Sequence, residues 1–147
     1  MLVQSKLKFA VLALAMMISL LTGVTSVQAA DIKKAHHIVF QVLDDDPVTW
    51  IHVLGIAKNV QHYLGKDNVA IEIVIHSGGI YMVTRDSAVS NNITAAQKNG
   101  IVFAVCEQTM KRDKFTQKDL HDGVKLVPIG AVEIMQKQEA GWTYIKL

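Results

Sequence analysis

The single cysteine of the chain, Cys106, is the residue whose type and position point most directly to chemistry. It ends the apolar run at residues 101–105, and Glu107, Gln108 and Thr109 follow at once. Where a strand passes into a helical turn, free amide groups and the helix dipole favour the thiolate, which is the nucleophilic form of cysteine. The alternative stays open that Cys106 is a small buried apolar side chain, as many unpaired cysteines are.

The charged residues after Cys106 act on the thiol in opposite directions. Glu107 disfavours a second negative charge beside it. Lys111, Arg112 and Lys114 supply positive potential if their segment folds back toward the sulfur. The sequence therefore leaves the direction of the change in the thiol pKa open.

Two further candidate features follow the first two predicted strands. Asp44–Asp46 come after the first strand, and His76 ends the second, followed by the turn Ser77-Gly78-Gly79. Because the carboxyl ends of parallel strands meet at one edge of a sheet, we expect these features and Cys106 at the same edge. His76 is a candidate to orient or deprotonate the thiol, and the turn is a candidate to hold a small anion. A hydrogen-bonded structural histidine and a tight turn are the alternatives.

The chemistry open to Cys106 is that of one thiol. The absence of a second cysteine excludes an intramolecular dithiol reaction and leaves a persulfide, a mixed disulfide or a sulfenic acid. The six histidines contain no pair at the i, i+4 spacing of helical metal ligands. His36 and His37 are adjacent on a strand and so point to opposite faces. We predict a site that uses neither a metal nor an organic cofactor.

Residues 1–30 have the pattern of a cleavable export signal. Lys6 and Lys8 precede an apolar stretch at residues 9–21, and Val27 and Ala29 are the small residues of a cleavage site. Cleavage after Ala29 or Ala30 fits equally well. The apolar stretch is shorter than the roughly 20 residues that span a membrane, with an uncleaved anchor as the alternative. We expect residues 31–147 to be periplasmic, with secretion as the second choice and no membrane segment in the mature form.

Removal of the signal leaves the chain without net charge. The 15 Lys and Arg against 13 Asp and Glu become 13 against 13 once Lys6 and Lys8 are gone. A neutral domain of this size offers no basic surface for nucleic acid, and it forms one compact unit. An odd cysteine in an oxidising compartment indicates an intermolecular bond or a free reactive thiol.

The elements that position these residues alternate between β-branched runs and helical segments, which is typical of an α/β domain with a parallel sheet. We predict one three-layer α/β/α domain, flavodoxin-like in outline, with a five-stranded parallel sheet. Asp46 before Pro47 is a helix-start signal, because a carboxylate caps free amides and proline is tolerated at the first helical position. The predicted strands are residues 36–43, 69–76, 101–106, 124–128 and 142–147, and the predicted helices are 47–64, a segment within 80–99, 116–121 and 130–140.

These motifs together resemble the DsrE/DsrF-like family, in its exported single-domain branch, over about residues 36–147. The resemblance is carried by the "DD…W" after the first strand, by "HYLGKDNVAIEIVIHSGG", by "GIVFAVCEQTM" and by "GVKLVPIGAVEIMQKQEAGWTYIKL". The last two are the specific motifs. The resemblance implies the strand order 4-3-2-1-5, which makes His76 and Cys106 neighbours on adjacent strands.

The resemblance also implies a function. Family members form trimers or hexamers, and some relay sulfur as a cysteine persulfide between partner proteins; the matching cysteine is Cys106. Many relatives follow this cysteine with Gly-Asn-Thr, whereas Glu107-Gln108-Thr109 follow it here. The relays of known role are cytoplasmic, so an exported chain needs other partners.

The leading hypothesis is a periplasmic, homo-oligomeric sulfur-handling protein in which Cys106 accepts sulfane sulfur and passes it between a donor and an acceptor protein. The alternatives are a non-catalytic binding module with a structural cysteine, and small-anion binding at the strand-end cleft. Whether the chain is an enzyme with turnover stays open.

Overall fold

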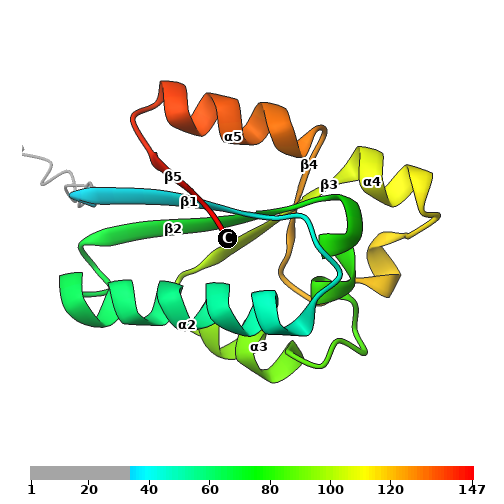
Figure 1. Cartoon of the computed structure of the whole chain (residues 1–147), viewed down its shortest axis with the longest axis horizontal. Coiled ribbons are helices and arrows are strands. Elements are labelled where there is room, and N and C mark those ends of the chain that lie inside the picture. The colour runs from blue at the N-terminus through cyan, green and yellow to red at the C-terminus, as the bar shows by residue number, and fades with distance from the viewer. Residues whose placement is uncertain (1–33) are drawn as a thin grey trace, which may run out of the picture. The chain divides into compact units, whose positions relative to one another are not determined.

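The structure is a computed structural model that describes residues 34–147, and the predicted signal at residues 1–30 lies outside the described residues. Strands and helices alternate along the described chain (Figure 1). They are β1 (His36–Val42), α2 (Pro47–Leu64), β2 (Val69–Ile75), the 3-10 helix η1 (Ser77–Val83), α3 (Ser90–Lys98), β3 (Val102–Cys106), α4 (Glu107–Arg112), the 3-10 helix η2 (Gln117–Asp119), β4 (Lys125–Val127), α5 (Gly130–Glu139) and β5 (Thr143–Lys146).

The five strands form one parallel sheet in the order β4-β3-β2-β1-β5, which confirms the predicted fold and strand order. The central strands β2 and β3 are almost entirely apolar and buried, as strands covered on both faces must be. None of the helices within residues 34–147 is both long enough and apolar enough to cross a membrane.

The two faces of the sheet are covered unequally. Helices α2 and α3 lie on one face, and α5 lies on the other (Figure 1). The face under α2 and α3 holds the main hydrophobic core, which includes Phe40, Ile73 and Phe103. The hydrophobic cluster between α5 and the sheet is smaller, with the buried members Val39, Val74, Ala104 and Val127 on the strands and Ile134 on α5. Apolar burial therefore holds α5 to the sheet less firmly than it holds the opposite layer.

Helix α2 begins as the sequence predicts. The Asp46 side chain accepts hydrogen bonds from the amides of Val48 and Thr49, and Pro47 occupies the first helical turn. Its buried face includes Gln61, whose side-chain amide donates to the carbonyl of Asn99 at 2.9 Å. That polar tie between α2 and the end of α3 has no signature in the apolar pattern.

The Ser-Gly-Gly segment is longer and more tightly packed than the predicted turn. It opens η1, so that Ile80–Val83 belong to this 3-10 helix and α3 begins only at Ser90. The amide of Gly79 donates to the carbonyl of Leu43 at 2.8 Å, which brings η1 against the end of β1. A Cβ atom at Gly79 would lie 2.6 Å from the carbonyl oxygen of Val42, so only glycine fits there.

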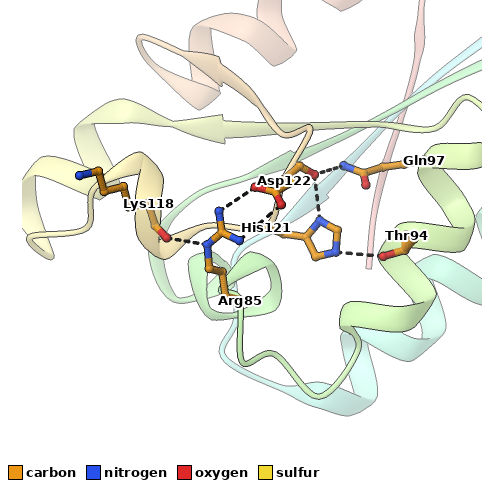
Figure 2. A network of polar contacts seen from close by, with 6 residues as sticks. All are labelled: Arg85, Thr94, Gln97, Lys118, His121 and Asp122. Carbon is orange, nitrogen blue, oxygen red and sulfur yellow. Dashed lines mark hydrogen bonds and ion pairs between the residues drawn. The ribbon is translucent and has the colours of Figure 1, made fainter.

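Figure 2 shows a polar network that ties the segment after η1 to the segment before β4. Arg85 Nη2 donates to Asp122 Oδ1 at 2.6 Å, and the backbone carbonyl of Asp122 accepts from Gln97 Nε2 at 2.9 Å. His121 places Nδ1 2.9 Å from the same carbonyl and Nε2 3.1 Å from Thr94 Oγ1. His121 thus connects the segment before β4 to helix α3 through Thr94.

We expect Gly79→Ala to lower the free energy of unfolding by about 1–3 kcal/mol, because the added methyl group meets backbone atoms that cannot move independently. Gly55→Ala in α2 is the matched control: its Cβ meets nothing within 4 Å, and alanine favours a helix. Urea unfolding followed by circular dichroism measures both variants. Equal stability of the two variants would contradict the packing described for η1.

Candidate functional site

Cys106 lies where three chain segments meet at the carboxyl edge of the sheet. It is the last residue of β3 and the N-cap residue of α4. His76 follows β2, and Gly130 opens α5 shortly after β4. The residue is 5% exposed, so the thiol is largely covered by the protein.

Gly130 brings α5 into close contact with the cysteine. A Cβ atom at this position would lie 3.3 Å from Cβ of Cys106, 3.2 Å from Cδ2 of His76 and 3.3 Å from Cγ1 of Val74. The missing side chain therefore lets the first turn of α5 approach the strand ends directly. The same contact places His76 and Cys106 around one glycine, as expected for residues that end neighbouring strands.

The amides around Cys106 favour its thiolate. Burial raises the pKa of the thiol, but the hydrogen bonds that the amide of Gly130, the amide and hydroxyl of Thr109 and the amide of Gln108 can donate to the thiolate outweigh it. The pKa therefore lies below its usual value. The thiol makes no capping hydrogen bond to α4, which fits a weak acceptor that becomes a strong one only when ionised. The donors that favour the thiolate thus belong to the first turns of α4 and α5.

The hydroxyl of Thr109 is held in place by a second hydrogen bond. The Ser77 amide donates to Thr109 Oγ1 at 3.0 Å, so that the oxygen is occupied as an acceptor and its own hydrogen is free for the sulfur. Ser77 has a φ of 53°, in the left-handed region that a serine rarely adopts. The start of η1 thus carries backbone strain in a residue that supports the thiolate donors.

His76 is held as a neutral imidazole by its neighbours. Gln41 Oε1 accepts from the hydroxyl of Tyr144, which leaves the Gln41 amide group as a donor to His76 Nε2 at 2.8 Å. The ring hydrogen then lies on Nδ1, which faces Ser77 Oγ at 3.3 Å. Burial, followed by the positive charge of Arg112, lowers the pKa of His76, in agreement with this tautomer. In this arrangement neither ring nitrogen is hydrogen-bonded to the sulfur.

Arg112 supplies positive charge to the site. Its charge lowers the pKa of His76, and its own pKa is raised first by Asp113 and, more weakly, by Cys106. Arg112 forms two hydrogen bonds with Asp113, of 2.7 and 2.6 Å, at the end of α4. Of the three cations that follow Cys106 in sequence, this is the one that acts on both proposed site residues.

The remaining candidate features have structural uses. The amides of Ser77 and Gly79 are occupied by Thr109 and Leu43, which leaves the turn with little capacity to hold an anion. Asp46 caps α2, and Trp50 Nε1 donates to the carbonyl of Asp44. Within residues 34–147, no three His, Cys, Asp or Glu side chains lie close enough together to hold a metal ion.

Comparison with known families assigns the chain. The sequence model of the DsrE/DsrF-like family matches residues 51–147, which is more than half of the chain and includes Cys106 and His76. The chain belongs to the DsrE/DsrF-like family. A comparison with curated proteins finds no match.

Solved structures share the fold of this chain. A protein of unknown function, MTH1491, from Methanobacterium thermoautotrophicum is 28% identical, with a TM-score of 0.73 over 76% of this chain and 99% of its own. The ychN protein from E. coli is 12% identical, with a TM-score of 0.64 over 78% and 100%. BT1422 from Bacteroides thetaiotaomicron, also of unknown function, is 14% identical, with a TM-score of 0.63 over 76% and 94%. The last two show the fold alone.

Three residues of the candidate site have signals that the sequence analysis did not use, or no signal at all. Gly130 follows the fourth strand at the same sheet edge, so the edge rule that selected His76 and Cys106 would also have selected it. Thr109 stands three residues after the cysteine, the position whose amide faces an N-cap side chain. Gln41 reaches His76 from β1, and nothing in a single sequence indicates that contact.

We expect Thr109→Val to raise the pKa of the Cys106 thiol, because it removes a hydroxyl donor that favours the thiolate. The pH profile of alkylation by iodoacetamide would move by about half a unit to higher pH. The variant also leaves the Ser77 amide without its acceptor, at a cost of about 1 kcal/mol in the free energy of unfolding. Thr109→Ser keeps the hydroxyl and should keep the profile of the original protein; a shift in both variants would argue against the hydroxyl as a donor.

Proposed function

We propose that this protein handles sulfane sulfur, and that the sulfur atom of Cys106 accepts it and holds it as a persulfide. The observation that carries the proposal is a lone cysteine whose thiolate is favoured by the amides of two helices at the strand-end edge. Membership of the DsrE/DsrF-like family supports a fold related to sulfur relay. The fold by itself does not assign the reaction, so the chemistry is argued from the site.

The proposed reaction needs one thiolate and no change in overall oxidation state. The Cys106 thiolate attacks the outer sulfur of a donor R–S–SH, a new sulfur–sulfur bond forms, and the old one breaks to release R–S⁻. The product is Cys106–S–SH. An acceptor thiolate then attacks the same outer sulfur and releases the Cys106 thiolate. A single cysteine is sufficient because each step exchanges one such bond for another.

The surroundings of the sulfur favour a small donor. Only 5% of Cys106 is exposed, so a hydropolysulfide ion reaches the sulfur more readily than a folded protein does. Arg112 places positive charge near the thiol, which favours an anionic donor. We assign His76 the role of orienting the Cys106 thiol by packing. Its ring carbon Cδ2 lies toward Gly130, and both of its ring nitrogens are occupied by other contacts.

Incubation with inorganic polysulfide should add about 32 Da to the native protein, the mass of one sulfur atom, and a reducing thiol should remove it. Intact mass spectrometry measures both steps. Cys106→Ser is the control and should gain no mass. A native protein whose reduced Cys106 takes up no sulfur, although the denatured protein does, would exclude the relay.

That outcome would favour the second candidate, a binding module in which Cys106 only packs. The observation in its favour is the burial of the thiol. Titration with a thiol reagent before and after denaturation separates the two, because a structural cysteine reacts only in the unfolded chain.

We further propose that the mature chain is exported to the periplasm after removal of residues 1–30. The support is the basic, apolar and small-residue pattern of that segment. Expression of the full chain in a Gram-negative host, followed by cell fractionation and N-terminal sequencing, should place the protein in the periplasmic fraction. The first residue should be Ala30 or Asp31. A full-length chain in the cytoplasm or the membrane would contradict the proposal.

The partners follow from the same proposal. The resemblance to the family implies a trimer or hexamer, and Val132 and Met135 on α5 expose apolar surface that an assembly would cover. Native mass spectrometry counts the subunits. A donor and an acceptor of sulfane sulfur complete the relay, and in the periplasm these differ from the partners of cytoplasmic relatives.

A further inference from the structure

The structure buries one carboxylate that the proposed chemistry does not use. Glu72 lies in the middle of β2, between Val39 of β1 and Val102 of β3, and its side chain is 3% exposed. The other members of the buried polar set in residues 34–147 are uncharged: Gln61, Thr84 and Thr109. A charge at this depth is costly unless ion pairs and hydrogen bonds compensate it, so its position needs a physical reason.

Glu72 is compensated by two lysines, one of which belongs to α5. Lys137 Nζ lies 2.8 Å from Glu72 Oε2, and Lys125 Nζ of β4 lies 3.6 Å from Oε1. Glu133, one turn before Lys137 on α5, pairs with Lys125 at 2.8 Å and with Lys137 at 3.8 Å. Trp142 covers Lys137, with its ring centroid 4.0 Å from the ammonium nitrogen. These four charged side chains form a cluster under α5.

The cluster and the cysteine lie at opposite ends of the same helix. Glu72 and Val74 of β2 and His76, one residue past its end, are two residues apart in extended chain. Their side chains therefore share the face toward α5. Gly130, at the start of α5, contacts Val74 and His76, whereas Lys137, seven residues later, contacts Glu72. The distances agree, since seven helical residues span about 10 Å and four strand residues about 13 Å. Helix α5 is thus fastened to β2 at two points.

The apolar contacts that hold α5 to the sheet are few. Among the residues of α5 only Gly130 and Ile134 are buried, and the apolar cluster beneath the helix is small. The ion pair at Lys137 is thus one of the few contacts that fix α5 over β2, and the position of the Gly130 amide depends on how α5 is held.

We propose that Glu72 is a positioning residue for Cys106: its ion pair with Lys137 holds α5 where the Gly130 amide meets the sulfur. The inference rests on Cys106 being the reacting group proposed above. Glu72 touches neither the sulfur nor the donor and acts only through the helix. Loss of the pair lets the first turn of α5 move away from Cys106, which weakens a donor to the thiolate.

The test is the sign of the shift in the thiol pKa in two variants. Glu72→Gln removes a negative charge and Lys137→Met removes a positive one. If charge alone acted on Cys106, Glu72→Gln would lower the thiol pKa and Lys137→Met would raise it. If position matters, both variants raise it, and we expect about half a unit in each, which lowers the alkylation rate at neutral pH about threefold.

Three controls keep the result decisive. Lys137→Arg keeps the charge and should return the pH profile to that of the original protein. Asp122→Asn breaks the Arg85 ion pair in the network of Figure 2, which involves no residue of α5, and should leave the profile unchanged. Hydrogen exchange of the Gly130 amide should be faster in Lys137→Met, whose site is part-exposed, so a failure of Glu72→Gln to fold does not end the test.

Opposite shifts in the two variants, or no shift and no faster exchange in Lys137→Met, would overturn the proposal. Each measurement uses the unreacted protein without a sulfur donor. Failure of the relay would therefore be seen in the polysulfide experiment alone, and failure of the positioning role in the thiol pKa alone.

Discussion

The proposed site depends on one close approach, that of the first residue of α5 to the ends of β2 and β3. At Gly130 the space for a side chain is filled by atoms of Val74, His76 and Cys106. The glycine lets the first turn of α5 approach Cys106, so that the Gly130 amide favours the thiolate. Burial alone would raise the pKa of the thiol, whereas burial together with the donors of Gly130, Thr109 and Gln108 gives a covered thiol that favours ionisation.

The same physical balance recurs at Glu72. There, too, burial disfavours the charged form and raises the pKa, while the ion pair with Lys137 works against it. At Cys106 the donors outweigh burial, whereas at Glu72 burial dominates. Cys106 and Glu72 lie on adjacent strands, and residues of α5 interact with both. The α5 face of the sheet therefore holds both of these buried ionisable groups. The opposite face of the sheet, under α2 and α3, holds the main hydrophobic core.

Much of the fold follows from local patterns in the sequence. The five strands, the capped start of α2 at Asp46 and the strand order implied by the family resemblance are all as expected. Alternation and turn chemistry are properties of neighbouring residues, and a single sequence records them directly. The edge rule likewise brings His76 and Cys106 together, because it depends only on where parallel strands end.

The details of the site depend on contacts between residues far apart in the chain. Gln41 of β1 contacts His76, which follows the neighbouring strand β2. Gly130, at the start of α5, contacts Cys106 at the end of β3. Arg112 acts electrostatically on both Cys106 and His76, and this depends on where the short helix α4 places its side chain. Such pairings are fixed by packing, which leaves no periodic trace in one sequence.

The last strand of the chain has a practical bearing on any work with this protein. Tyr144 of β5 donates to Gln41, and Gln41 donates to His76, so the support of the histidine begins on β5. A purification tag fused directly after residue 147 would adjoin the strand that begins this network. A removable tag, or a flexible spacer before it, keeps the strand free to pair with β1.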